Sequence, residues 1–164
     1  MPKNNRWFPI GAVLLLLSFL HPLYAQWGGG GGGTVNNSST AASTNRALCS
    51  IRAANFNITT DQACVIPGTV TAWVPTSIIV TNCSGSFTLA AGGVYPAASK
   101  GGTALVAAGQ VYTALSGSTV VLGLTLAANI ATTRQTAGTV YLSLTTGTGS
   151  AATCDFYVWG NDLT

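Results

Sequence analysis

The sequence predicts an all-β fold: a single antiparallel β-sandwich of Greek-key or jelly-roll type with about eight strands. Thr and Val, which favour strands, are abundant, and glycines supply frequent turn signals between short apolar segments. No long segment combines a helical period with a charged outer face, which argues against a helical bundle. Periodicity alone does not separate a sandwich from a closed barrel, so the barrel stays as the alternative.

Residues 1–25 have the layout of a secretory signal peptide. Lys3 and Arg6 precede an apolar run over 10–20, and Ala25 places a small residue before the expected cleavage point. The run has about a dozen residues and a membrane span needs about twenty, so we expect cleavage and no span afterwards; an uncleaved anchor is the alternative. The mature chain, 26–164, is therefore expected to be exported, to the periplasm, the cell surface or the medium.

The segment 26–45 is predicted to be a flexible tether. Trp27 is followed by six glycines, and the residues after them are almost all Thr, Asn, Ser and Ala. Such side chains cannot offset the entropy cost of ordering the chain. The remainder, 46–164, is expected to be one domain, because it is long enough for one hydrophobic core and too short for two.

Within this domain the strand signals follow one another at short intervals. The first expected strands are 51–58, 63–66 and 72–82, and Pro67-Gly68 ends the second of them. The later expected strands are 86–90, 94–95, 119–126, 140–145 and 154–159. Between them, 96–102 is expected to be an exposed loop, and 103–115 to be two short strands or one turn of helix.

The last two of these strands are predicted to form an antiparallel hairpin. Apolar residues alternate along both segments, at Val140, Leu142 and Leu144 and at Cys154, Phe156 and Val158. Pairing Leu142 with Phe156 would place all of them on one side. The other side would present Tyr141, Tyr157 and Trp159 in a row, a binding face that could stack on sugar rings or contact a protein. The alternative is that other parts of the chain cover this face.

The cysteines predict disulfides. All four lie in the mature chain, at Cys49, Cys64, Cys83 and Cys154, and an even number in an exported chain is typical of a disulfide framework. Of the three pairings available, we predict Cys49–Cys64, which closes a local loop, and Cys83–Cys154, which joins distant strands of one core. No metal site or cofactor is expected, because the chain has no C-x-x-C pair and its histidine, His21, lies in the signal peptide.

The charges argue against two function classes. The mature chain has four cations and three aspartates, which gives it a net charge of +1. The charged residues are Arg46, Arg52, Lys100, Arg134, Asp61, Asp155 and Asp162. Scattered cations do not form the basic stripe that nucleic-acid binding requires. No enzyme activity is expected either, because without His or Glu only the aspartates could serve as acid or base, and a Ser99–Lys100 pair in a Gly-rich loop would point apart. The low net charge gives weak colloidal repulsion, which is compatible with a homo-oligomer.

Four segments carry a resemblance to known proteins. They are IIVTNCSGS at 78–86, AAGGVY at 90–95, SKGGT at 99–103 and CDFYVWG at 154–160. Together they resemble small β-rich proteins of unassigned function from bacterial genomes and from phage or prophage virion genes. The resemblance covers roughly 72–164 and implies a virion or surface component without a catalytic motif. The signal peptide and the cysteines are departures from those relatives.

These features predict an exported, non-enzymatic structural or adhesion module of the cell surface or envelope. Its expected partner is a protein or a glycan at that surface. One alternative is a carbohydrate-binding module that uses the aromatic face. The other is a virion structural protein derived from a phage or prophage, which flanking tail or capsid genes would indicate.

Overall fold

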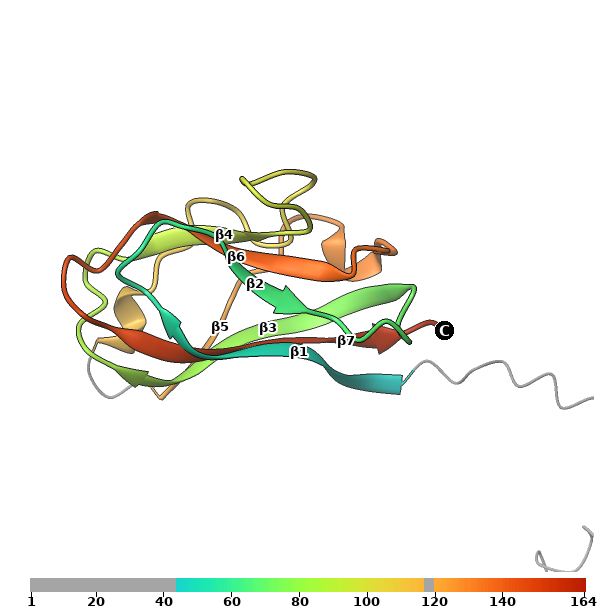
Figure 1. Ribbon diagram of the computed structural model, residues 1–164, viewed down its shortest axis with the longest axis horizontal. Helices are drawn as coiled ribbons and strands as arrows, with labels where there is room; N and C mark the ends of the chain where they lie inside the picture. The colour runs from blue at the N-terminus through green and yellow to red at the C-terminus, as the bar shows by residue number, and fades with distance from the viewer. Residues whose placement is uncertain (1–43, 117–119) are drawn as a thin grey trace, which may run out of the picture. The chain divides into compact units, whose positions relative to one another are not determined.

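In a computed structural model that describes residues 44–116 and 120–164, two antiparallel sheets pack face to face (Figure 1). The four-stranded sheet has the order β1-β7-β3-β5 and the three-stranded sheet the order β2-β6-β4. The strands are β1 Thr44–Asn55, β2 Gln62–Val65, β3 Trp73–Ser84, β4 Ala91–Tyr95, β5 Val121–Gly123, β6 Thr139–Thr146 and β7 Thr153–Asp162, and two 3-10 turns are η1 Thr113–Leu115 and η2 Ile130–Thr132. The predicted all-β sandwich is confirmed, with seven strands among the described residues instead of about eight.

Strand β1 begins at Thr44, so the last two residues of the predicted tether belong to the sheet. Thr44 and Asn45 pair with the end of β7. Asn45 also accepts a hydrogen bond of 2.9 Å from the Thr76 hydroxyl of β3. The rest of the predicted tether and the predicted signal peptide, residues 1–43, lie outside the described residues. Across 44–116 and 120–164, no helix is both long and apolar enough to span a membrane.

Two expected strands differ from the structure. Residues 86–90 form a loop, because Gly85 turns the chain with a φ of +100° and the Phe87 amide then donates to the Ser116 hydroxyl (2.7 Å) instead of to a neighbouring strand. The expected strand 119–126 is shortened to β5, which pairs with β3 over three residues. The segment 103–115 contains isolated β-bridges at Val106 and Val111, followed by η1.

The predicted hairpin of the last two strands is wrong, because β6 and β7 belong to different sheets. Strand β6 pairs with β2 and β4, whereas β7 lies between β1 and β3. The alternation itself is correct: the predicted inward residues are all fully buried, at Val140, Leu142, Leu144, Cys154, Phe156 and Val158. They meet across the core instead of side by side, since both sheets of a sandwich turn an apolar face inward. Alternation is the same for a hairpin and for a chain that crosses between sheets.

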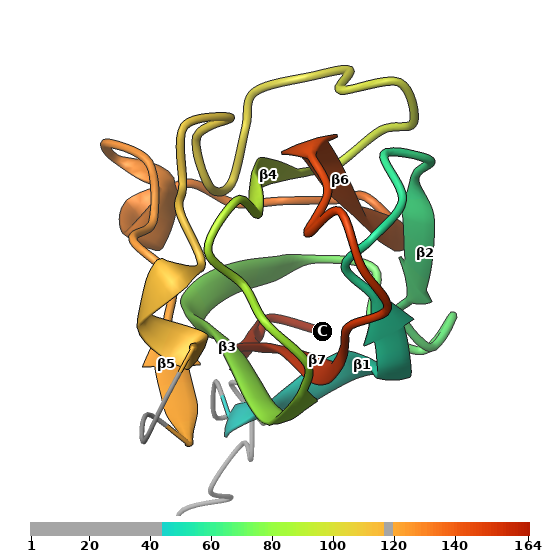
Figure 2. The ribbon, with the colours of Figure 1, turned by 90° about the vertical axis from the view of Figure 1, so that its left-hand side faces the viewer.

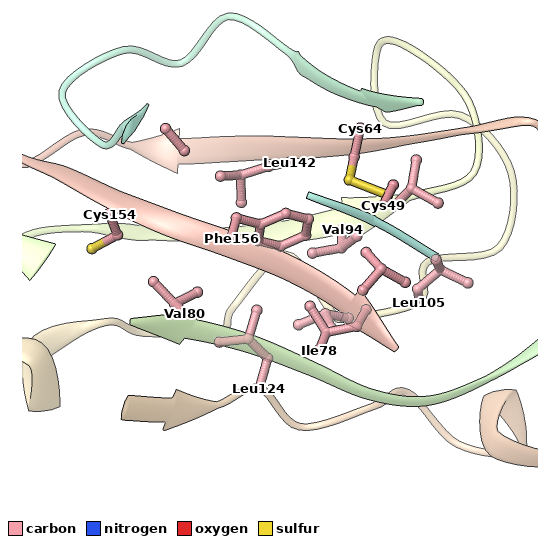
Figure 3. Close-up of a cluster of buried hydrophobic side chains, with 14 of the residues drawn as sticks. Cys49, Cys64, Ile78, Val80, Val94, Leu105, Leu124, Leu142, Cys154 and Phe156 are labelled. Carbon is pink, nitrogen blue, oxygen red and sulfur yellow. A yellow bond between two sulfur atoms is a disulfide. The ribbon is translucent and has the colours of Figure 1, made fainter. Parts of the chain in front are cut away.

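Side chains from both the strands and the loops fill the core between the sheets (Figure 3). Ile78, Val80 and Phe156 of the four-stranded sheet are completely buried, as are Val94 and Leu142 of the three-stranded sheet. Buried loop residues, Leu105 and Leu124 among them, complete this cluster. At one end Phe56 packs edge-on against Phe87 and Tyr112, with ring centroids 5.4 and 5.0 Å apart.

Both predicted disulfides are confirmed. Cys49–Cys64 joins β1 to β2 and therefore ties the two sheets together, with Cα atoms 5.6 Å apart (Figure 3). Cys83–Cys154 joins the neighbouring strands β3 and β7 within the four-stranded sheet, with Cα atoms 4.2 Å apart. All four cysteines are thus paired.

The segment 96–109 returns along the free edge of β4. The Val94 amide donates to the Val106 carbonyl, and the Leu105 amide donates to the Val94 carbonyl. A side chain at Gly93 would come within 2.5 Å of the Val106 carbonyl, so this close approach requires glycine. In Figure 2 the segment, drawn in yellow-green, lies beyond β4 and β6 on the side away from the four-stranded sheet. It therefore overhangs the outer side of the three-stranded sheet.

Candidate functional site

The three residues of the predicted aromatic face do not come together. Tyr141 lies on β6 in the three-stranded sheet, whereas Tyr157 and Trp159 lie on β7 in the four-stranded sheet. Each alternates with core residues and so points to the outer side of its own sheet. The row of three depended on the hairpin, and it is lost because the chain crosses to the other sheet between the two strands.

The two aromatic residues of β7 are half-buried. The Arg52 guanidinium lies 5.1 Å from the centre of the Tyr157 ring, a cation–π contact that occupies one face of that ring. The Trp159 ring is half-buried, and its indole Nε1 is fully buried without a hydrogen-bond partner among the described residues. On the other sheet, Tyr141 lies opposite the buried Tyr95. Among residues 44–116 and 120–164, these three aromatic side chains do not form one broad platform for a ligand.

Asp155 lies between the inward-facing Cys154 and Phe156, and so on the outer side of β7, yet it is buried at 5% exposure. It lies between two β-bulges, because the register of β7 shifts against both of its neighbours beside this residue. In those bulges Ala53 has a φ of +49° and Asn82 a φ of +51°. The Asp155 carboxylate accepts hydrogen bonds from the Ala53 amide (2.9 Å), from Arg52 Nη1 (2.7 Å) and from Asn82 Nδ2 (3.2 Å). The Ala53 amide and then Arg52 lower the pKa of this carboxyl group. Asp155 thus holds three strands in register.

Asp162, near the end of β7, also joins separate segments of the chain, as Asp155 does. It accepts hydrogen bonds from the hydroxyl and the amide of Thr164, at 2.5 and 3.0 Å, and it forms an ion pair of 2.6 Å with Arg46 of β1. The Thr164 hydroxyl, the Thr164 amide and then Arg46 lower its pKa. The carboxylate therefore fastens the beginning of β1 and the last residue of the chain to β7.

Asp61, the third aspartate, lines an open hollow of about 460 Å³ on the outer side of the three-stranded sheet. Three parts of the chain form its wall: the β1–β2 loop, the 96–109 segment and β6. The lining residues are Thr59, Thr60, Asp61, Ser99, Lys100 and Ser143. Here Asp61 Oδ2 accepts a hydrogen bond from the Ser99 amide (2.5 Å), and Oδ1 accepts one from the Ser143 hydroxyl (2.6 Å). One carboxylate thus ties two loops to a strand.

Local backbone geometry brings Ser99 and Lys100 to this hollow. Their φ angles are +56° and +59°, two successive left-handed residues in a turn that the Gly101 amide closes onto the Ala98 carbonyl (3.1 Å). Such angles are uncommon outside glycine, and the surrounding structure must hold them. The hydrogen bond from the Ser99 amide to Asp61 is one such restraint. It fixes the position of the turn that carries Lys100.

The hollow combines one negative and one positive charge. The Ser143 hydroxyl and then the Ser99 amide lower the pKa of Asp61, and the nearby charge of Lys100 lowers it further. A carboxyl group with a lowered pKa is ionised at neutral pH and is a weak proton acceptor, so it is poorly suited to general-base catalysis. Ser143, at 1% exposure, is too buried to reach a substrate. The arrangement is suited to binding and not to proton transfer.

The sequence did not predict this hollow. The predicted exposed loop 96–102 does carry Lys100, but the sequence offered no sign that Asp61, in the β1–β2 loop, and Ser143, on β6, lie beside it. The residues that meet are far apart in the chain: 38 positions separate Asp61 from Ser99 and 82 separate it from Ser143. No motif marks them. Within the part of the chain that the structure describes, no group of three or more potential metal ligands is present.

Comparisons of the chain with protein-family models, with curated proteins and with solved structures find no match.

Proposed function

We propose that this chain is an exported, non-enzymatic structural or adhesion module of a cell surface or envelope. One observation carries the proposal: each of the three aspartates is occupied in holding the fold. Asp155 holds the bulges, Asp162 holds β1 and the last residue, and Asp61 holds two loops on β6. The pKa of each carboxyl group is lowered, whereas a general acid or base functions best with a pKa near the working pH. The hydrogen bonds and ion pairs of these carboxylates stabilise the fold, which supports a structural role for them.

Both disulfides support the proposed location. They link all four cysteines, and such bonds persist in oxidising compartments such as the periplasm and the cell exterior. The predicted signal peptide over 1–25 would deliver the chain to such a compartment. Export itself stays part of the proposal.

The sheet edges support a module that remains folded at an exposed surface. Strand β1, the longest edge strand, carries two irregularities in its pairing and two arginines, Arg46 and Arg52. Strands β2 and β5, at two other edges, have four and three residues. The fourth edge, at β4, is covered by 104–106. Bulges, charges, short strands and covering segments all hinder unwanted edge-to-edge pairing.

Cell fractionation tests the location. The full chain with a C-terminal tag is expressed in its source cells, and a matched variant lacks residues 2–25. We expect the full chain in the envelope, at the surface or in the medium, with its N-terminus within two residues of Gln26 and with both disulfides found by peptide mapping without reduction. The variant should stay in the cytoplasm with free thiols. A full-length protein that begins at Met1 or Pro2 and stays in the cytoplasm would contradict the proposal.

Enzyme assays test the other half of the proposal. We expect the folded mature chain to show no hydrolytic activity, so replacing Lys100 by Ala should change no catalytic rate. A hydrolytic activity that this change abolishes, with the melting temperature unchanged, would refute the non-enzymatic assignment. The resemblance to phage virion proteins stays a prediction, which flanking tail or capsid genes would support.

A further inference from the structure

We propose that the hollow around Asp61 and Lys100 binds a neutral glycan. The inference rests on the proposed adhesion function, for which it supplies a ligand class and a site. It differs from the aromatic face expected from the sequence, because none of the six lining residues is aromatic. Recognition here depends on hydrogen bonds to sugar hydroxyls.

The size of the hollow fits one sugar ring. Small-molecule sites usually have volumes of about 300–1,000 Å³, and this one has about 460 Å³. A hexose with its hydroxyls fits within that volume, and the open side lets a glycan chain continue into solvent.

The donors and acceptors of the hollow match hydroxyl groups. A carboxylate has about four lone-pair positions, and at Asp61 two of them are taken by the Ser99 amide and the Ser143 hydroxyl. The remaining positions can accept hydrogen bonds from a sugar, while Lys100 offers donors from an exposed ammonium group. A sugar hydroxyl both donates and accepts, so one ring can donate to Asp61 and accept from Lys100. Hydrogen bonds to charged groups of this kind are about twice as strong as neutral ones.

The charges of the hollow offset each other. An anionic ligand would be attracted by Lys100 and repelled by Asp61, and the reverse holds for a cationic ligand, so neither gains a large net electrostatic attraction. A calcium ion takes six to eight oxygen ligands, commonly from several carboxylates, whereas this hollow has one carboxylate and an ammonium group. With one charge of each sign, the hollow favours an uncharged polar ligand.

The site is fixed before any ligand binds. Asp61 is held by two hydrogen bonds, one of them from a serine with only 1% of its surface exposed. Ser143 is therefore a positioning residue, and Thr59, Thr60, Ser99 and Lys100 are the exposed contacts. A group that is already ordered loses little conformational entropy on binding, which favours affinity.

A glycan array followed by calorimetry tests the proposal on the mature chain, 26–164. The array carries neutral hexoses and N-acetylhexosamines, their β- and α-linked oligomers, and acidic saccharides. The variants are Lys100→Met and Thr60→Val, and the matched control is Arg134→Met, which removes an exposed cation outside the hollow. Melting temperatures of all variants show whether the fold is retained.

We expect the mature chain to bind at least one neutral saccharide, with at least tenfold weaker affinity in Lys100→Met and unchanged affinity in Arg134→Met. Binding of acidic saccharides alone would overturn the proposal, as would equal affinity of Lys100→Met and the parent chain. The absence of binding to every neutral saccharide would also overturn it, and so would binding that Tyr157→Ala abolishes and Lys100→Met leaves unchanged. Each of these failures concerns the hollow alone, because the fractionation experiment tests the location independently.

Discussion

Removing each disulfide in turn should show that the longer loop stabilises the fold more. The two perturbations are Cys49→Ala with Cys64→Ala, and Cys83→Ala with Cys154→Ala. The sequence separations are 15 and 71 residues. The entropy that a cross-link removes from the unfolded chain grows with the logarithm of loop length, which gives about 3 kcal/mol for the short loop and about 4.4 kcal/mol for the long one.

The two loops do not overlap in the sequence, so their contributions should add to about 7 kcal/mol. Domains of ordinary size have unfolding free energies of about 5–15 kcal/mol. A variant without either bond should therefore be close to unfolding at 25 °C, whereas each single-bond variant should remain folded.

Urea unfolding of the mature chain, followed by fluorescence and circular dichroism, measures these differences. The expected gap of about 1.4 kcal/mol between the two variants corresponds to about 0.5–1.4 M in the urea midpoint for slopes of about 1–3 kcal/mol/M. The parent chain in reducing agent should match the variant that lacks both bonds. If the short-loop variant lost as much stability as the long-loop variant, or more, the unfolded-chain argument would be refuted. The link between the sheets that Cys49–Cys64 provides would then outweigh loop length.

Three further predictions concern the segment before β1, the aspartate carboxylates and Gly92. Deleting 26–43 should leave the melting temperature of the mature chain almost unchanged, since β1 begins at Thr44; a drop of many degrees in a thermal scan would show that this segment packs on the domain. The aspartates have lowered pKa values in the folded protein, so the stability they contribute is complete above the ordinary Asp pKa of about 3.9 and is lost as the pH falls through the lower folded values. Urea midpoints measured from pH 7 to pH 2 should fall in this acidic window, and Asp155→Asn should be less stable at pH 7 and show a shallower fall; an Asp155→Asn profile parallel to that of the parent would contradict this reasoning. Gly92→Ala would place its Cβ 2.4 Å from the Leu144 Cα, whereas the Cβ of Gly68→Ala would meet nothing within 4 Å. The first change should cost about 1–3 kcal/mol and the second should be close to neutral by chemical unfolding; equal effects would show that the chain near β4 and β6 adjusts freely.

The sequence predicted features that depend on local pattern. The strands around Val80 and Phe156 follow from alternation, and both cysteine pairs agree with the structure. Sheet membership could not be predicted in the same way. Leu142 and Phe156 have the same apolar pattern in a hairpin and in two facing sheets, so the crossing between β6 and β7 left no local signal. The aromatic face was wrong for the same reason.

The hollow could not be predicted from the sequence either, because it also depends on the strand order. Asp61 and Ser143 meet only because β2 pairs with β6, which places the β1–β2 loop beside the outer side of that strand. The segment that carries Ser99 reaches them after leaving β4, on the other side of β6. A site made by three separate elements requires the correct strand order. Without that order, Asp61 resembles any aspartate in a turn.

The position of β7 has a consequence for how the molecule is made. It is the last strand in chain order, yet it lies between β1 and β3 at the centre of its sheet. Until β7 has been synthesised, β1 has no strand partner among the described residues of that sheet, and β3 has only the short β5. Folding thus waits for pairings between the first and last strands, and topologies of this kind fold slowly. The four-stranded sheet can therefore close only after nearly the whole domain has been synthesised, because its central strand is the last to be made.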